Sequence, residues 1–418
     1  MAVGLVLGGG APNLPLMSGA LLALDEAGVE FDVVSTTGAG MLIGLLYAAP
    51  KNGTRQESLK ATRDLGVHDA IYDVFPVNYK IFHKYGLMAE AYTKFHQQWL
   101  SKMPRSTSAE RYIADMTAFW MAIFCPGDLS PTTQGLCQPP PWIDLVVDFD
   151  KLKGFHGEFL MSAYCVEEEK EVSFGKKEIT ADHFRAALAM PLIYAPYKLN
   201  GKTYLEGSAF DTLAFSPGGV MRKNLIDTII YFDVLGQRKM IREPQSLYDA
   251  WVLSIINPLM RIAEMDTKLY NDGAAELHGI ELLPMPFGKN ISEEQWPHVL
   301  DWSHSNMSQL FDIGYKTGEK FVQAHKDILE ESSKNRSKIV LDVMKELGVH
   351  DRFMALVQGP EGKRPGWQEN FNAGEVFKDL TPEEAMKFMV VFAAAGQMFE
   401  EAPEPKPITR KKRRRSSK

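Results

Sequence analysis

The sequence predicts an α/β protein built around a mostly parallel central sheet. Residues 3–7 form a short apolar run that ends in Gly8-Gly9-Gly10, as expected of a buried parallel strand that leads into a tight turn. A helical pattern follows, and then a second apolar run meets a second glycine-containing turn and another helix. This alternation of strand, turn and helix is typical of the opening of a parallel α/β sheet.

The other elements are predicted from apolar runs and from helical spacing. Apolar residues at 17, 21, 24 and 27 predict an amphipathic helix over 17–27 that Gly28 closes. The stretch 41–49 is apolar on every side, which predicts a buried helix. Further strands are expected at 31–34, 142–147, 158–163 and 228–234, and residues 245–330 show a helical pattern.

We divide the chain into three parts. Residues 1–330 form the main domain, 331–400 are expected to be a helical C-terminal appendage, and 401–418 a proline-containing linker with a disordered basic tail. Within the main domain, residues from about 54 to 140 are helical in pattern and rich in aromatic residues. An insertion of this length either covers a site as a lid, covers a partner surface, or is a plain helical subdomain, and the sequence leaves these open.

The composition is that of a globular protein. Hydrophobic residues make up 45% of the 418 residues, which is enough for a full core. The three cysteines are too few and too scattered for a disulfide framework or a zinc site, so we expect neither a metal nor a cofactor. With no signal-peptide pattern and no run of about 18 apolar residues, we expect a cytoplasmic protein, or one held peripherally at a membrane or in a protein complex.

Charge is unevenly distributed along the chain. The last nine residues carry seven cations and no anion, whereas the remainder has 39 basic against 53 acidic residues. A cationic tail on an acidic body is either a solvated end or a contact for an anionic membrane surface, a nucleic acid or an acidic protein partner. The contact, if made, would use Arg410, Lys411, Lys412, Arg413, Arg414 and Arg415.

The second glycine turn has the setting of a nucleophile elbow without the nucleophile. An elbow of the type G-x-S-x-G places a serine on a strained corner between a strand and a helix. Here the five positions read Thr36-Thr37-Gly38-Ala39-Gly40, so glycine occupies the third. The triplet Gly8-Gly9-Gly10 could present amides to an anion or an oxyanion, although its spacing matches neither a dinucleotide fingerprint nor a Walker loop.

Three motifs in this order resemble the patatin-like phospholipase family. They are the glycine loop, the elbow that runs into "LIGLLYA", and "FRAALAMPLIYAPYKLNGKTYLEGSAF", which is similar to the family segment that ends in D-G-[GA]. A fourth segment, "FDIGYKTG", resembles a late family helix, so the resemblance spans roughly residues 3–325. It implies a three-layer patatin-like fold for 1–330 and a lipid acyl hydrolase scaffold that uses a serine–aspartate dyad.

The family's catalytic positions carry over to this sequence with substitutions. Gly38 stands at the position of the nucleophilic serine, and Glu206 stands at the position of the dyad aspartate. Gly8, Gly9 and Gly10 match the oxyanion loop, and Ala39 follows the nucleophile position. The loop also departs from the pattern, because Pro12 replaces the basic residue of the family and Asn13 replaces its next glycine.

The resemblance therefore implies a patatin-fold protein with a degenerate dyad that binds a lipid or acyl group, or forms a complex, with impaired catalysis. A side chain without oxygen or sulfur cannot form the covalent acyl-enzyme. The first alternative is an active acyl hydrolase or acyltransferase that uses Thr37 as nucleophile or a water activated by Glu206. The second is a structural subunit of a larger assembly. No specific nucleic-acid motif is present, and the oligomeric state stays open.

Overall fold

The computed structural model describes a defined set of residues, mostly between 2 and 329. They are 2–10, 13–86, 88–125, 127, 129–215, 226–235, 242–244, 247–271, 280–298, 300–326, 329, 345 and 381. The chain divides into two compact units, 1–332 and 333–418. Apart from residues 345 and 381, the predicted appendage at 331–400 and the tail with Arg410–Arg415 lie outside the described residues.

An eight-stranded sheet organises the first unit and is mostly parallel, as predicted. Its strand order is β10-β9-β1-β2-β4-β8-β7, and β5 also pairs with β4. The run from β10 to β4 is parallel, whereas β5, β8 and β7 are antiparallel to their neighbours. The strands are β1 (Ala2–Leu7), β2 (Val33–Thr36), β4 (Glu158–Cys165), β5 (Lys170–Gly175), β7 (Tyr197–Leu199), β8 (Lys202–Glu206), β9 (Ile226–Phe232) and β10 (Glu281–Pro284). A separate parallel pair joins β3 (Gly135–Cys137) and β6 (Leu192–Tyr194).

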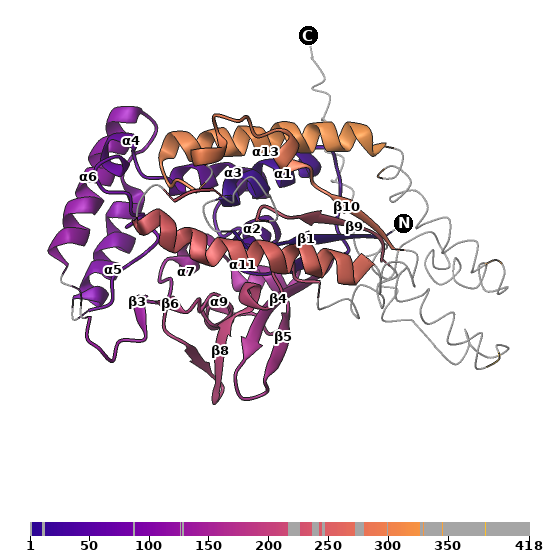
Figure 1. Ribbon diagram of the computed structural model, residues 1–418, viewed down its shortest axis with the longest axis horizontal. Helices are drawn as coiled ribbons and strands as arrows, with labels where there is room; N and C mark the ends of the chain where they lie inside the picture. The colour runs from indigo at the N-terminus through magenta and orange to yellow at the C-terminus, as the bar shows by residue number, and fades with distance from the viewer. Residues whose placement is uncertain are drawn as a thin grey trace, which may run out of the picture. The chain divides into compact units, whose positions relative to one another are not determined.

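Helices cover both faces of this sheet (Figure 1). The longer ones are α1 (Leu14–Glu26), α2 (Ala39–Ala48), α5 (Ala89–Gln98), α6 (Ser108–Phe124), α11 (Leu247–Tyr270) and α13 (His304–Ala324). Short α-helices are α3 (Arg55–Lys60), α4 (Asp69–Tyr72), α7 (Ile143–Val146), α8 (Phe149–Lys153) and α9 (Ala181–Ala187). Short 3₁₀ helices are η2 (Ala61–Leu65), η3 (Leu100–Lys102), η4 (Gly207–Ala209), η7 (Phe287–Lys289) and η8 (Trp296–His298).

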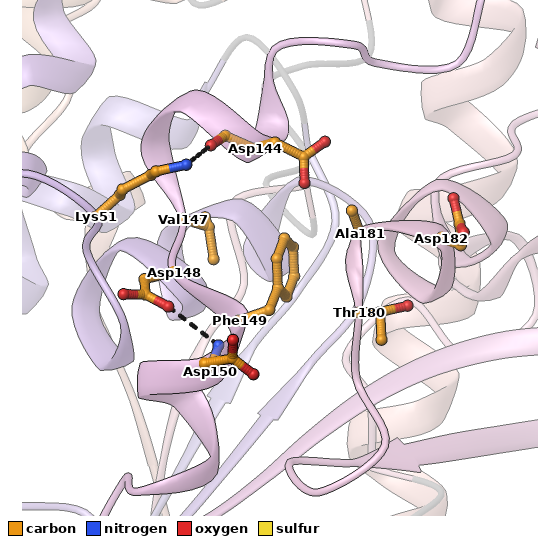
Figure 2. Close-up of a pocket in the computed structure, with 9 residues that line it drawn as sticks. All are labelled: Lys51, Asp144, Val147, Asp148, Phe149, Asp150, Thr180, Ala181 and Asp182. Atoms are coloured by element: carbon orange, nitrogen blue, oxygen red, sulfur yellow. Dashed lines mark hydrogen bonds between the residues drawn. The ribbon is translucent and has the colours of Figure 1, made fainter.

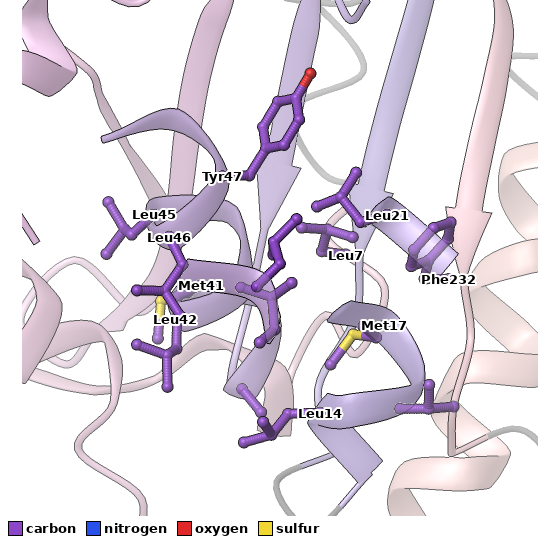
Figure 3. Close-up of a cluster of buried hydrophobic side chains, with 14 of the residues drawn as sticks. Leu7, Leu14, Met17, Leu21, Met41, Leu42, Leu45, Leu46, Tyr47 and Phe232 are labelled. Carbon is purple, nitrogen blue, oxygen red and sulfur yellow. The ribbon is translucent and has the colours of Figure 1, made fainter. Parts of the chain in front are cut away.

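Two hydrophobic clusters, one on each face, give the domain its three layers. Successive side chains of a strand point to opposite faces, and β1 follows this rule. Leu5 and Leu7 pack in the cluster of α1, α2 and α13. Figure 3 shows the part of this cluster that contains Leu7, Met17 and Met41. Val6 packs in a second cluster with α11 residues such as Ala263 and Tyr270. A strand buried on both faces reads as a continuous apolar run, which is why β1 was recognisable from sequence.

Most predicted elements of the sheet are confirmed, and two are corrected. The expected strands at 3–7, 158–163 and 228–234 are present, while the one at 31–34 begins two residues later, at Val33. The strand expected at 142–147 is wrong, because residues Ile143–Val146 form a helical turn. Trp142, Ile143 and Val147 are the buried members of that run, and Ile143 and Val147 lie four residues apart, which is helical spacing. The strand β10 interrupts the region 245–330 that was expected to be helical throughout.

Helical turns dominate the predicted insertion at about 54–140. It contains α3 to α6 and ends at the short strand β3. Figure 1 shows α4, α5 and α6 gathered at one end of the sheet domain. Among the described residues, no helix is both long and apolar enough to cross a membrane. The same residues contain no group of three or more His, Cys, Asp or Glu side chains placed to hold a metal ion.

Candidate functional site

The glycine loop at the end of β1 uses two of its amides for its own structure. The Gly8 amide donates to the carbonyl of Phe232 at 3.3 Å, and the Gly9 amide donates to the carbonyl of Thr212 at 3.0 Å. No described residue accepts a hydrogen bond from the Gly10 amide, and Gly10 lines a large cavity. Of the three predicted oxyanion glycines, Gly10 is therefore the one whose amide has no acceptor among the described residues.

The Gly38 corner has the strained backbone of a nucleophile elbow. It joins β2 to α2 with φ +51° and ψ −131°, a conformation that side-chain-bearing residues rarely adopt. The amides of Gly40 and Met41 donate to the carbonyls of Thr37 and Gly38 at 3.0 and 3.2 Å, which closes the turn. The Ala39 amide, at the start of α2, has no acceptor among the described residues.

Close packing explains the second glycine of the elbow. A Cβ on Gly40 would lie 2.3 Å from the Leu7 carbonyl oxygen and 2.6 Å from that of Gly8. Only a glycine lets the first turn of α2 approach the end of β1 this closely. The elbow thus stays in contact with the glycine loop, and Gly10 and Ala39 line the same cavity.

Glu206 lies at the end of β8 and faces the elbow. Its amide donates to the carbonyl of Ala189 at 3.1 Å, and its side chain is buried. Burial raises the pKa of this carboxyl to about 7, against a smaller opposing effect of a hydrogen bond from Ser208. A Cβ on Gly38 would stand 2.9 Å from Oε1 of Glu206, so the carboxyl fills the space beside the elbow.

Ser208 completes the polar end of the site. It belongs to the 3₁₀ turn η4, and its Oγ donates to Oε1 of Glu206 at 2.7 Å. The same Oγ would lie 3.0 Å from a Cβ on Gly38 and 3.3 Å from a Cβ on Gly9. The Ser208 hydroxyl therefore occupies the gap between the elbow and the glycine loop.

Hydrogen bonds to backbone carbonyls hold residues 206–214, the segment that contains Ser208, against the sheet. The Thr212 hydroxyl donates to the carbonyl of Ser208 at 2.9 Å, and the Thr212 carbonyl accepts from the Gly9 amide. The Ser35 hydroxyl on β2 donates to the carbonyl of Ala214 at 2.8 Å. These contacts fix residues 206–214 relative to both glycine turns, so the position of Ser208 is set by the fold.

The site opens into an apolar cavity of about 560 Å³. Gly38, Ala39, Glu206 and Ser208 form its polar end. Its walls are large apolar side chains from the insertion, from the β6 region and from α11, among them Phe82, Trp142, Phe184, Leu188, Trp251 and Ile255. The volume lies within the range of about 300–1,000 Å³ that is typical of small-molecule sites.

Two other side chains with a potential nucleophile are poorly placed for catalysis. Thr37 is buried, is not among the cavity-lining residues, and its hydroxyl has no hydrogen-bond partner among the described residues. Cys137 does line the cavity, but burial raises the pKa of its thiol to about 11. A thiol with such a pKa stays protonated near neutral pH and is a weak nucleophile.

Sequence reasoning missed Ser208, although a signal was present. The family pattern D-G-[GA] reads Glu206-Gly207-Ser208 here, so a hydroxyl appears at the third position. At Gly38 a hydroxyl is missing from the pattern. Two compensating changes 170 positions apart become meaningful only when the fold brings them into contact.

A second, polar pocket lies elsewhere on the domain and shares no residue with the cavity (Figure 2). It has a volume of about 420 Å³ and is lined by Lys51, Asp144, Asp148, Asp150 and Asp182, among others. The carboxylate of Asp148 accepts the amides of Asp150 and Lys151, which caps α8. Asp144 and Asp182 pair with Arg185. The carboxylate of Asp150 pairs with Lys153, so each of these four acidic side chains has a structural partner within the protein.

Comparisons with known proteins address the domain that contains the apolar cavity. A family model described as patatin-like phospholipase matches residues 5–217, a range that includes the glycine loop, the elbow and Ser208. No curated protein matches the chain. Among solved structures, the crystal structure of VipD from Legionella pneumophila is similar at 11% identity and a TM-score of 0.35, covering 95% of this chain and 85% of that chain.

Proposed function

Because the chain belongs to the patatin-like phospholipase family, we propose that its cavity binds the acyl chain of a lipid or lipid-like molecule. The observation that carries this proposal is the contrast between the cavity walls and its end. Most side chains around the 560 Å³ are apolar, and the carboxyl of Glu206 and the hydroxyl of Ser208 lie together beside the elbow. A ligand with a long apolar part and one polar carbonyl group matches that distribution.

Burial of the ligand's acyl chain in the cavity supplies the binding affinity. Each methylene group that leaves water for an apolar site contributes about 0.8 kcal/mol, so a chain of several methylenes offsets the entropy lost on binding. Aromatic walls such as Phe82, Trp142 and Trp251 offer large contact areas. The polar end would then orient the carbonyl group toward the amides of Gly10 and Ala39.

Gly38 makes catalysis by the family's own route impossible at the elbow. Loss of a nucleophile leaves only the contribution of the oxyanion site and of binding, which costs several orders of magnitude in rate. We therefore infer a protein that retains acyl binding, with impaired elbow chemistry, as its main function. Its place in a protein complex or at a membrane surface is a further part of this proposal, supported by the basic residues 410–415.

A pair of variants on one helix tests acyl binding. Ile255 of α11 lines the cavity, whereas Met265 of the same helix does not and is 48% exposed. We expect Ile255→Trp to fill part of the cavity and weaken the binding of a fluorescent long-chain fatty acid at least tenfold. Met265→Trp should bind like the wild type. Wild-type protein that binds no fatty acid, or equal affinities for all three proteins, would show that the cavity is not the site.

A further inference from the structure

We propose that Ser208 is the nucleophile of an acyl-transfer reaction in this cavity and that Glu206 is its general base, a role that rests on the proposed acyl binding. The reactive hydroxyl then comes from the loop after β8 and not from the elbow. The ligand class is an ester of a long-chain carboxylic acid. The glycine at position 38 becomes a requirement of this arrangement.

The geometry of the pair is that of an activated nucleophile. Oγ of Ser208 donates to Oε1 of Glu206 at 2.7 Å, which lies within the reach of a nucleophile and its base. Both side chains line the cavity where the ligand's carbonyl group would lie. The hydroxyl lies 3.0 Å from the Cβ position of an elbow residue, in the region that an elbow side chain would enter.

The base is buried and has one described side-chain hydrogen-bond donor. Burial raises the pKa of the Glu206 carboxyl to about 7. Near neutral pH a substantial fraction of the Glu206 side chains is therefore ionised and can accept a proton. The main chain of Glu206 is fixed by its pairing with Ala163 of β4 and by the bond to Ala189. A base held in this way needs little reorganisation during the reaction.

The negative charge that develops on the carbonyl oxygen of the ester can be stabilised by amides of residues that line the same cavity. Gly10 and Ala39 line the cavity, and their amides donate to none of the described residues. The Ala39 amide also stands at the N-terminus of α2, a helix of ten residues, where the helix dipole favours negative charge. An amide that follows the elbow position is the usual oxyanion donor of such corners.

The reaction is balanced with water as the only co-reactant. Glu206 takes the proton of Ser208 as Oγ bonds to the ester carbonyl carbon, and the carbonyl oxygen becomes the oxyanion. Its collapse breaks the bond to the alcohol oxygen, which leaves with the proton from Glu206. Water then attacks the acyl-Ser208 carbonyl while Glu206 takes its proton, and the carboxylic acid leaves as that proton returns to Oγ.

Covalent labelling of the full chain tests the assignment directly. The probe is a long-chain fluorophosphonate, which reacts with activated serines, and the modified residue is located by mass spectrometry of the tryptic peptide 203–222. We expect the adduct on Ser208 of the wild type and its loss in Ser208→Ala. The same variant should lower kcat/KM for a p-nitrophenyl acyl ester at least about 100-fold.

The matched control is Ser162→Ala. Ser162 is also buried, its hydroxyl has no partner among the described residues, and it does not line the cavity. It should keep both labelling of Ser208 and ester hydrolysis. Thermal unfolding of each variant shows that the fold is retained, and Ser208→Cys, which keeps a nucleophile, should be alkylated by an acyl-chain chloroketone at position 208.

Binding of the fluorescent fatty acid, measured in the same samples, separates the two proposals. Fatty-acid binding without a Ser208 adduct in the wild type would overturn the catalytic role and leave acyl binding standing. An adduct on Thr37, Cys137 or another residue would overturn it equally. If neither binding nor labelling is observed, both proposals fail.

Discussion

The hydroxyl of Ser208 lies 3.0 Å from the position that a Cβ on Gly38 would occupy. The two residues are therefore complementary in space: a side chain at position 38 and the present hydroxyl at 208 compete for one gap. The same Cβ would lie 2.9 Å from Glu206, which strengthens the competition. The Ser208 hydroxyl therefore fits in its present position because residue 38 has no side chain.

Substitution of Gly38 by alanine should destabilise the protein more than the same change at Gly28. Both glycines have positive φ, +51° and +76°, but a Cβ on Gly28 would meet no atom within 4 Å. Gly28→Ala should therefore cost only the backbone strain, about 1–2 kcal/mol. Gly38→Ala adds the crowding against Glu206 and Ser208. Chemical denaturation of the two variants measures the difference, and equal losses would contradict the crowding.

Stability should fall as the pH rises through the titration range of Glu206. The folded-state pKa of about 7 lies above the ordinary value of 4.5, so the folded protein binds the proton more tightly than the unfolded chain. This contribution is fully present below about pH 4.5 and is lost as the pH rises through about 7. Its size is roughly 3 kcal/mol, at 1.36 kcal/mol per pKa unit.

The variant Glu206→Gln isolates this contribution, because the glutamine keeps an oxygen for the Ser208 hydroxyl and cannot ionise. Free energies of unfolding at pH 5 and pH 8 should differ less for the variant than for the wild type. The pKa of Asp266 is also raised to about 7 by burial and by Asp211, and acts in the same direction in both proteins. If the free energy of unfolding depends on pH identically in the wild type and the variant, the pKa of Glu206 is not raised by burial.

Several parts of the fold and site were predictable from sequence because their signals are local. The strand β1 is buried on both faces and reads as a continuous apolar run. The two glycine turns could be located by their place between predicted strands and helices, whereas Glu206 was located by the resemblance of its segment to the family motif. The fold class follows from these features, and the family model independently covers them.

The parts that were missed depend on contacts that sequence spacing does not show. Residues 142–147 are apolar enough for a strand, yet they form a helical turn that buries Ile143 and Val147 in the main core. The edge strand β10 has one fully buried residue in four, which leaves little periodicity to detect. Ser208 matters because of its distance to Gly38, and no pattern along the chain encodes that distance.

Removal of the basic tail should weaken association with anionic membranes. The deleted segment, 410–418, carries seven cations and no anions. A basic residue near an anionic surface contributes about 1 kcal/mol, and the attraction falls with ionic strength. We expect the full chain to sediment with phosphatidylserine-containing vesicles at low salt, and the truncated chain to stay in solution. Neutral vesicles are the control, and equal sedimentation of both proteins would exclude the tail as the contact.

Three simultaneous substitutions should return the nucleophile to the elbow. Gly38→Ser alone places its Cβ 2.9 Å from Oε1 of Glu206 and 3.0 Å from Oγ of Ser208, so the new hydroxyl has no room to be activated. Combining it with Glu206→Asp and Ser208→Gly shortens the acid by one methylene and empties the gap. We expect the fluorophosphonate to label position 38 in the triple variant and to leave that position unlabelled in the single variant. The double variant Glu206→Asp with Ser208→Gly is the matched control and should be inert. Equal labelling of position 38 in the single and triple variants would mean that Glu206 and Ser208 do not compete with an elbow side chain.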